Sequence, residues 1–297
     1  MSERSLHSGG RVLRSRHEAA GLLAAMLLAA PVLIGIAYAL AASTGMVGPG
    51  ATGQASVARL ARALREQSTW VGLTWTLFVA TAATMLATGA AVMVAVIFRN
   101  ESRTSRAGRL LAAFPMTIPH VVAGALGVWM LSQSGMLSRL AFAVGFTSRP
   151  ADMPPLVYDQ LGAGLVMTLA WKEAAFLSVV ATAVLATRGG DAEEAAQTLG
   201  ASSWDVFRRV TWPLLWRGLA PAVIAVFVFV LGNYEVAALL APSDPLALPL
   251  LVAERAADPD LARRGDAYVV SLLLLSIAAV AVALHEWTRA RWEPIAP

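Results

Sequence analysis

The sequence predicts an all-α, polytopic integral membrane protein with six transmembrane helices. Three observations indicate this fold: 57% of the 297 residues are hydrophobic, only 14% are charged, and the mean hydropathy is +0.63. An average soluble domain carries about 25% charged residues. Because the apolar residues form long blocks rather than the 3.6-residue stripes of a soluble bundle, the low charge indicates that lipid is the solvent.

Six apolar segments are long enough to cross a bilayer, whose hydrocarbon core of roughly 30 Å needs about 20 helical residues. In lipid every backbone amide must be hydrogen-bonded within the protein, so we expect these segments to be helices. The first segment is longer than the roughly 7–15 apolar residues of a signal-peptide core, so we expect an uncleaved anchor. The alternative is a signal peptide cleaved near Ala39-Leu40-Ala41. The predicted spans are residues 19–42, 70–98, 110–134, 161–187, 219–240 and 268–287, with tails at 1–18 and 288–297.

The arginines predict the orientation of the chain in the membrane. Basic residues are enriched in the short cytoplasmic segments of membrane proteins. If the N-terminus is inside the cell, the cytoplasmic segments hold all but eight of the arginines. The outer segments hold Arg59, Arg62, Arg65, Arg139, Arg149, Arg255, Arg263 and Arg264. We therefore expect a bacterial inner-membrane protein with both termini and the 188–218 loop in the cytoplasm.

The composition argues against several functions. The chain has no cysteine, which excludes disulfides and thiolate sites. Its basic residues are scattered between apolar blocks, which argues against nucleic-acid binding. The single lysine, Lys172, follows Trp171, so no ATP-binding G-x-x-x-x-G-K-[ST] loop is present. The four histidines form no H-E-x-x-H pair, so we expect no metal site, no catalytic residue and no enzymatic activity.

The loop between the fourth and fifth spans predicts a bend. Gly189-Gly190 ends the preceding helix, and Asp191 is placed to cap a new one, with Glu194 at capping-box spacing. Gly200 suits the left-handed residue that ends a helix. The helix between them carries one small-residue face, formed by Ala192, Ala195 and Ala196.

A second short helix is expected after Gly200. Ser202 or Ser203 can cap it, and Pro213 fits the first turn of the fifth span. Its apolar face is Trp204, Phe207 and Val210. We call residues 191–213 the elbow. From these residues alone, a surface that fits a groove of another protein and an ordinary interfacial amphipathic loop are equally supported.

The elbow resembles the EAA loop of binding-protein-dependent ABC importer permeases. The family pattern is E-A-A, three residues, G, nine residues and I-x-L-P. Here it reads Glu194-Ala195-Ala196, then Gly200, then Val210-Thr211-Trp212-Pro213, with apolar Val210 and Trp212 in place of Ile and Leu. The resemblance covers residues 70–287, with the first span as an added N-terminal helix.

This resemblance implies the type I ABC importer permease fold and a set of partners. These are an ATP-binding-cassette ATPase dimer that holds ATP and Mg, a second permease subunit, an extracytoplasmic substrate-binding protein and membrane lipid. A heterodimer of permeases is favoured, and a homodimer is the alternative. The chain itself is expected to bind no cofactor. By the same resemblance the ATPase-coupling residues are Glu194, Ala195, Ala196, Gly200, Trp204, Phe207 and Pro213.

Four polar residues within the predicted spans are candidates for the translocation path. A charge at the bilayer centre costs about 2.5–3.5 kcal/mol on insertion scales, so such residues should face protein or water. Lys172 and Glu173 lie in the fourth span and Asn233 and Glu235 in the fifth. For Lys172 and Glu173, lining the path and bracing the dimer or neighbouring helices are equally supported. For Asn233 and Glu235, a pore-facing role and a structural role at the outward mouth are equally supported. Trp171-Lys172-Glu173 also resembles a sequence in some permeases of this family.

The segment Gly232-Asn233-Tyr234-Glu235-Val236, followed by Leu246-Ala247-Leu248-Pro249, resembles the polyamine, thiamine and ferric-iron branch of these permeases. A polyamine, thiamine or iron-like solute is therefore an expectation. The alternative function is an ion-coupled secondary transporter that uses the intramembrane charges. That class predicts inverted repeats, which the sequence does not display.

Two further features have alternative interpretations. Pro115 and Pro119 either set the start of the third span or break it, and the first is favoured. The charged residues of the last outer loop, which include Asp258, Asp260 and Asp266, are expected to form a solvated face. Docking of a substrate-binding protein is their functional alternative.

Overall fold

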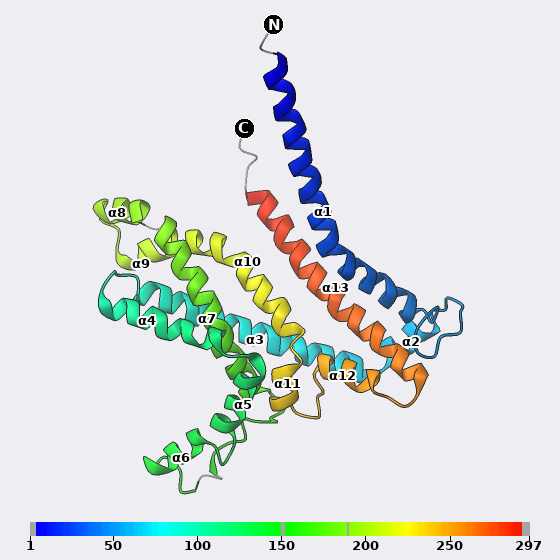
Figure 1. The fold of residues 1–297 in the computed structure, drawn as a ribbon. Coiled ribbons are helices and arrows are strands. Elements are labelled where there is room, and N and C mark those ends of the chain that lie inside the picture. The colour runs from blue at the N-terminus through cyan, green and yellow to red at the C-terminus, as the bar shows by residue number, and fades with distance from the viewer. Residues whose placement is uncertain (1–3, 150–151, 189, 293–297) are drawn as a thin grey trace. The chain divides into compact units, whose positions relative to one another are not determined.

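The structure, a computed structural model, describes the backbone of residues 4–149, 152–188 and 190–292 and the side chains of residues 21–149, 152–187 and 190–291. Parts of both expected tails (1–3 and 293–297) and Gly189 lie outside this range. The described residues form helices, turns and irregular segments, with no strand (Figure 1). The helices are α1 (Arg4–Ser43), α2 (Ala58–Arg65), α3 (Gln67–Ile97), α4 (Arg103–Ala113), a 3₁₀ turn (Phe114–Thr117), α5 (His120–Leu131), α6 (Met136–Ala143), α7 (Ala163–Arg188), α8 (Gly190–Thr198), α9 (Ser203–Val206), a π turn (Phe207–Thr211), α10 (Trp212–Leu231), α11 (Glu235–Leu240), α12 (Leu248–Ala256) and α13 (Leu261–Trp292).

The prediction of six membrane-spanning helices is confirmed. By length and composition, six described helical segments can cross a membrane: Gly21–Ser43, Gln67–Ile97, His120–Ala143, Ala163–Thr187, Ser203–Leu231 and Leu261–Arg291. The chain divides into two compact units. The first comprises the residues up to Ala63 with Arg255–Leu272, and the second comprises Leu64–Glu254 with the residues from Leu273 onward.

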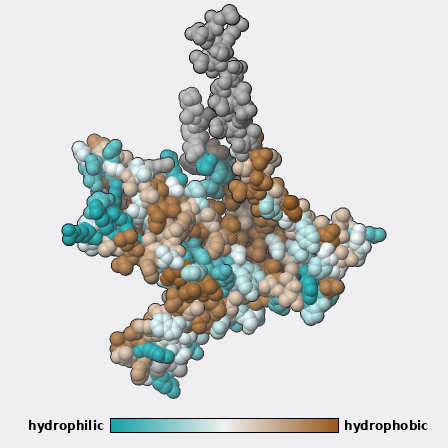
Figure 2. Space-filling view, in the orientation of Figure 1, coloured by the Kyte–Doolittle hydropathy of each residue, from teal (hydrophilic) through white to brown (hydrophobic). Residues whose placement is uncertain are grey.

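The second unit is built around α3, which packs chiefly on α7 and α10. One face of α3 consists of small residues that are completely or almost completely buried, namely Ala80, Ala83, Ala87, Ala91 and Ala95. Small side chains let two helix backbones approach closely, which is how helices associate in lipid. The opposite face carries exposed Phe78, Met85 and Met93. Figure 2 shows the resulting hydrophobic surface of the bundle. The two faces of α3 therefore suit a helix with protein on one side and lipid on the other.

Two predicted spans are interrupted. The span expected at 110–134 is divided by the 3₁₀ turn that contains Pro115, and α5 begins after Pro119. Proline removes a helical hydrogen bond and clashes with the preceding turn, so the two prolines both end α4 and set the start of α5. The span expected at 219–240 breaks at Gly232, between α10 and α11. Single helices were expected in both places, so these boundaries differ from the prediction.

The interrupted helices pack closely where glycine permits it. A Cβ added to Gly127 of α5 would lie 2.5 Å from Oγ1 of Thr168 in α7 and 3.0 Å from Leu240 in α11. At Gly124, a Cβ would lie 2.9 Å from Leu239. Both positions leave no room for a larger side chain. Helices α5, α7 and α11 therefore meet at these two glycines.

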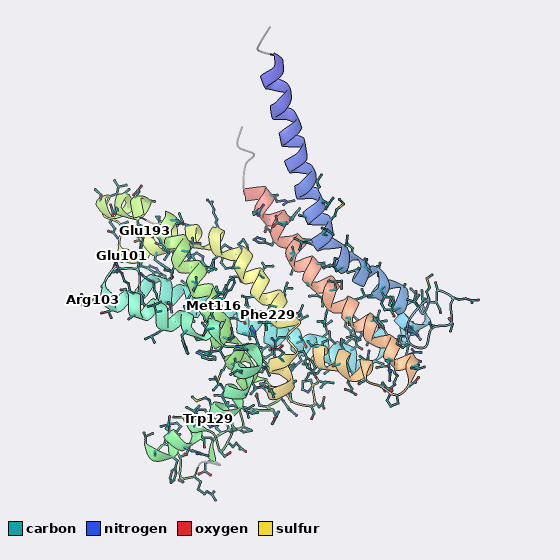
Figure 3. All side chains as sticks on the ribbon, viewed as in Figure 1. Glu101, Arg103, Met116, Trp129, Glu193 and Phe229 are labelled. Atoms are coloured by element: carbon teal, nitrogen blue, oxygen red, sulfur yellow. The ribbon has the colours of Figure 1, made fainter. Side chains whose placement is uncertain are left out.

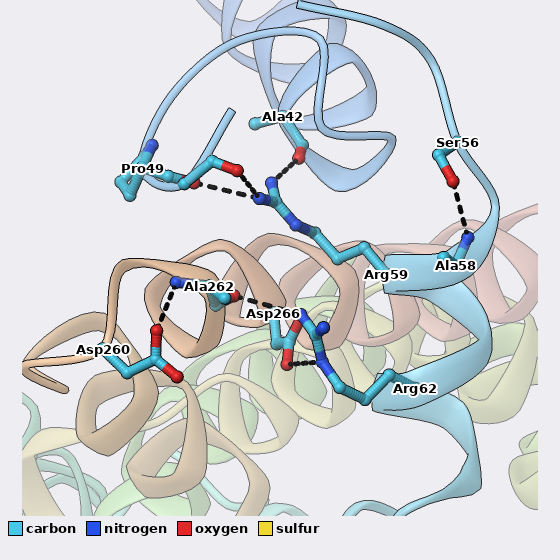
Figure 4. Close-up of polar contacts among 10 residues, drawn as sticks. Ala42, Pro49, Ser56, Ala58, Arg59, Arg62, Asp260, Ala262 and Asp266 are labelled. Carbon is cyan, nitrogen blue, oxygen red and sulfur yellow. Dashed lines mark hydrogen bonds and ion pairs between the residues drawn. The ribbon is translucent and has the colours of Figure 1, made fainter. Parts of the chain in front are cut away.

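In the first unit, two arginines of α2 hold the surrounding chain together (Figure 4). Arg59 is buried and donates hydrogen bonds to the carbonyl oxygens of Ala42 (2.5 Å), Pro49 (3.0 Å) and Gly50 (2.8 Å). These bonds join the end of α1 to the loop that follows it. The guanidinium thus satisfies carbonyl groups that a loop would otherwise leave unpaired.

Arg62 forms a two-pronged ion pair with Asp266 of α13. Its Nε and Nη2 lie 3.0 and 2.7 Å from the two carboxylate oxygens. The Asp266 side chain is 1% exposed, whereas that of Arg62 is 46% exposed. The expectation that Asp266 belongs to a solvated face is therefore wrong, because its carboxylate is buried against a partner more than 200 residues away in sequence. Asp258 and Asp260 instead accept backbone hydrogen bonds at the start of α13.

We expect the two members of this ion pair to respond unequally to substitution. Arg62→Ala leaves a buried carboxylate without its partner. Breaking a fully buried pair in this way lowers the free energy of unfolding by about 3–5 kcal/mol. Because Arg62 is partly exposed, we expect a loss of about 2 kcal/mol. Asp266→Asn keeps a hydrogen-bond acceptor and should lose less than about 1 kcal/mol. Limited proteolysis of the 44–57 loop in detergent measures both. Equal cleavage rates for the two variants would contradict this assignment.

Candidate functional site

The elbow is a helix, a glycine turn and a second helix, as the sequence predicts. Helix α8 ends at Thr198, and Gly200, with a φ of +85°, follows it in the C-capping turn. The Gly200 amide donates to Gln197 O (2.9 Å) and the Ala201 amide donates to Ala196 O (3.1 Å), which is the paired arrangement of a Schellman C-cap. Asp191 was expected to cap α8, but the helix begins at Gly190 and places Asp191 within the first turn.

The second arm of the elbow begins at a capped helix. The Ser202 hydroxyl accepts a hydrogen bond from the Asp205 amide (3.2 Å) and donates one to the Asp205 carboxylate (2.6 Å). Beyond α9 the chain continues through the π turn into α10, so the second helix is longer than predicted. Pro213 occupies the first turn of α10, but helical turns precede it without a loop, so its missing N–H removes one helical hydrogen bond where the π turn meets α10.

The outer surface of the elbow is small and exposed. Glu194 and Ala195 are exposed, Ala196 is half-buried, and Leu199 is 88% exposed. Beside them is a shallow hollow of about 330 Å³ lined by residues of both arms. The lining residues are Ala196, Leu199, Gly200, Ala201, Asp205, Val206, Arg209 and Val210. The exposed surface of the elbow thus combines small side chains with one large apolar side chain, Leu199.

Aromatic rings follow the second arm. The Trp204 and Phe207 rings stack at 5.7 Å between centroids, Phe207 and Trp212 lie 6.4 Å apart, and Trp212 and Trp216 stack at 5.7 Å. Trp204 is 67% exposed, and Phe207 packs against the hydrophobic core. This row of four aromatic rings therefore runs from the elbow surface towards the bundle. Of the predicted coupling residues, Phe207 is the one that touches the core.

The residue that fixes the elbow to the bundle is Glu193, which sequence reasoning missed. Its side chain is 6% exposed; it forms an ion pair with Arg99, just beyond the end of α3, and accepts a hydrogen bond from the Thr211 hydroxyl (2.6 Å). Glu193 therefore connects α3, α8 and the π turn. Figure 3 shows it near the helix end where Glu101 and Arg103 lie. The signal in the sequence was an acidic residue directly before the exposed Glu194, pointing to another face of the same helix.

The two charged residues predicted in the fourth span are buried in α7. The Glu173 carboxylate lies 2.9 Å from Nε2 of His120, the first residue of α5, and the His120 ring lies 4.6 Å from that of Phe229. Lys172 is 6% exposed. Among the described residues it has no hydrogen bond or ion pair. The two neighbours therefore differ: Glu173 braces two helices through His120, whereas Lys172 has no such partner among the described residues.

Asn233 and Glu235 also have different roles. Asn233 is buried, and its side-chain oxygen accepts a hydrogen bond from the Val236 amide (3.0 Å) in the first turn of α11. Glu235 is exposed. The structure thus gives Asn233 a structural bond at the helix break and leaves Glu235 available to solvent or ligand. Within the described residues, no group of three or more His, Asp or Glu side chains could hold a metal ion.

Comparisons with known proteins identify the family of this arrangement. The family described as binding-protein-dependent transport system inner membrane component matches residues 87–293. The chain is 29% identical over 194 residues to the molybdenum transport system permease protein ModB of Mycobacterium tuberculosis, covering 64% of this chain and 68% of that protein. It is 27% identical over 169 residues to the probable sulfate transport system permease protein cysT of Chlorokybus atmophyticus, covering 55% and 54%.

A solved structure shares the fold. A chain of a bacterial ABC transporter involved in the import of the acidic polysaccharide alginate superposes with a TM-score of 0.72 at 18% identity. The match covers 94% of this chain and 98% of the other. At this level of identity the likeness concerns the fold alone.

We expect the Glu193 contacts to hold α8 in place. Glu193→Ala removes the ion pair with Arg99 and leaves the buried Thr211 hydroxyl without an acceptor. Hydrogen bonds to charged groups contribute about 1.5–3 kcal/mol, so the amides of α8 should exchange hydrogen roughly 10–100-fold faster. Hydrogen–deuterium exchange in detergent measures this. The matched control is Glu194→Ala, one residue further along and exposed, which should leave exchange unchanged; equal rates in the two variants would contradict the role of Glu193.

Proposed function

Because the chain belongs to the family of binding-protein-dependent transport system inner membrane components, we propose that it couples to a separate ATPase through the elbow. It is a membrane-spanning permease subunit of an ABC importer, with the six-helix architecture of that class. Coupling requires a surface of the permease that an ATPase can bind. It also requires specific contacts that join this surface to the transmembrane helices. The elbow combines both properties.

The observation that carries this proposal is the contrast between Glu193 and its neighbours on α8. Ala195 and Leu199 present a small and partly apolar outer surface, while Glu193 on another face is buried against Arg99 and Thr211. An ATPase that moved the outer surface would therefore also move α3 and α10. The residues proposed for contact with the ATPase are Glu194, Ala195, Ala196, Gly200 and Trp204, with Phe207 and Pro213 shaping the second arm.

The proposed assembly has two ATPases, a second permease and an extracytoplasmic substrate-binding protein. ATP and Mg belong to the ATPases, and this chain binds no cofactor. The second permease is proposed to be a different chain. Both termini and the elbow lie in the cytoplasm, an orientation supported by the arginine bias of the sequence. Protease cleavage of the elbow from outside intact cells would contradict it.

We propose that the solute is a small oxyanion. Sulfate is a tetrahedral dianion, and molybdenum in neutral water forms the similar dianion molybdate. One relative is named as a permease for molybdenum and another as a probable permease for sulfate. Lys172 supports the same class, because it is a cation in a membrane-spanning helix, is 6% exposed as a residue and has no ion pair among the described residues, so an anionic ligand would complement it. A polyamine, thiamine or iron-like cation is the competing class, and exposed Glu235 is the residue that suits it.

Coupling is tested at Gly200. Its φ of +85° strains a branched side chain, although a Cβ there would meet no neighbour. We expect Gly200→Val to insert normally but to lower ATP-dependent uptake by the assembled complex in proteoliposomes at least about ten-fold. Gly200→Asn should retain most uptake, since asparagine tolerates the left-handed conformation.

The matched control for this experiment is Gly190→Val, which adds the same branched side chain in open space but at a glycine without positive φ. It should import at the normal rate. Normal uptake by Gly200→Val would show that the elbow does not couple. Uptake that follows an ion gradient and ignores ATP would support a secondary transporter instead.

The solute class is tested at Lys172. Lys172→Met keeps the length of the side chain and removes its charge, so uptake of sulfate or molybdate should fall about ten-fold or more, the effect of losing one charge-assisted contact. Lys172→Arg should retain part of the uptake. If Lys172→Met imports both anions at the wild-type rate, or if a polyamine is imported in their place, the oxyanion assignment is wrong.

A further inference from the structure

A groove lies between α3, α4 and α7, in a part of the chain that the coupling mechanism does not use. It encloses about 510 Å³, and its apolar lining includes Val94 of α3, Leu110 and Ala113 of α4, and Val179 and Ala183 of α7. We call it the α4–α7 groove. Leu110 is 73% exposed and Val179 is 45% exposed, so the groove opens to the surroundings of the bundle.

The groove has a charged end and an apolar end. Arg106 and Arg109 line it on α4, and Ala186 lines it near the end of α7. Helix α7 leads directly towards α8, and the segment before α4 contains Arg99, the partner of Glu193. The arginines therefore lie at the elbow end of the bundle. From Ala186 down to Ser178 the groove extends about 12 Å along the helix, at 1.5 Å per residue.

The two arginines differ in how firmly they are held. The Arg109 guanidinium donates to the Phe98 carbonyl oxygen (2.7 Å), which fixes it beside the groove. Arg106 lies 3.2 Å from the Glu101 carboxylate, with side chains 64% and 78% exposed, and Arg109 lies 3.8 Å from the same carboxylate. Exposed pairs of this kind are weak, so an arriving anion can compete for Arg106. One carboxylate against two guanidinium groups leaves this end of the groove positive.

The deeper part of the groove suits a hydrocarbon chain. Its walls are alanine, valine and leucine with two hydroxyl residues, Ser178 and Thr182. The Ser178 hydroxyl donates to Ala174 O (2.6 Å) within its own helix. That hydroxyl therefore does not require a polar ligand. A positive rim at the membrane surface above an apolar slot has the chemistry of a phospholipid with an anionic headgroup.

We propose that the α4–α7 groove binds an anionic glycerophospholipid. Its phosphate pairs with Arg106 and Arg109, and one acyl chain lies against Leu110, Ala113 and Val179. This binding site is independent of the proposed coupling and of the solute, because its residues belong to neither. It places a lipid against the same helix, α3, whose end is tied to the elbow.

Native mass spectrometry of the assembled complex, purified in mild detergent with phosphatidylglycerol added, tests this site. Arg106→Gln should lower the retained phosphatidylglycerol about five-fold, the effect of one basic residue near an anionic surface. Leu110→Trp should lower it to a similar extent by filling the slot, and its exposed position allows the chain to fold. Arg139→Gln, at an exposed arginine of α6 remote from the groove, should have no effect. Equal retention of zwitterionic phosphatidylethanolamine, or unchanged phosphatidylglycerol in both groove variants, would overturn the proposal.

A second measurement identifies the occupant directly. The chain has no cysteine, so Val179→Cys introduces its sole thiol, to which a benzophenone maleimide can be attached. Illumination of the complex in phosphatidylglycerol membranes should yield a lipid adduct. A cross-link to the second permease subunit would show that the groove is a subunit interface and would overturn the lipid assignment.

Discussion

The buried carboxylate of Glu193 is the interaction on which the arrangement of the elbow depends. A charged group withdrawn from water is tolerated only when it is paired and hydrogen-bonded, and Glu193 has both a guanidinium and a hydroxyl partner. These partners come from the chain just beyond α3 and from the π turn before α10. One side chain thus ties together three segments, 94 and 18 residues apart in sequence. Without it α8 would lose its charged connection to the chain just beyond α3.

The lipid environment imposes a second constraint, which explains the composition of the helices. Because the hydrophobic effect does not drive helices together in lipid, the contact faces must approach closely enough for dispersion forces to act. The alanines of α3 and the glycines of α5 meet this requirement. The large side chains Phe78, Met85 and Met93 are consequently directed away from the contact, an inversion of the pattern of a soluble core.

Much of this architecture follows from the sequence. Hydropathy alone identifies six spans, and the spacing of Gly200, Ser202 and Pro213 predicts the elbow, because helix ends are local events governed by a few residues. The sequence predicts the positions of the breaks in the third and fifth spans poorly, because proline and glycine are the only signs of an interruption within an apolar stretch. Glu193, Asp266 and Arg59 were missed as buried anchors. A charged residue that is paired across 17 to 204 positions looks in sequence like any solvated one, and only the fold reveals its partner.

The absence of a loop between α9 and α10 has a mechanical consequence. Residues Ser203–Leu231 form one uninterrupted run of helical turns, 29 residues or about 43 Å long. The π turn lies near its start and Pro221 lies within it, and it ends where Gly232 and Asn233 separate α10 from α11. A displacement of the elbow would therefore pass into the fifth span with no intervening loop to absorb it.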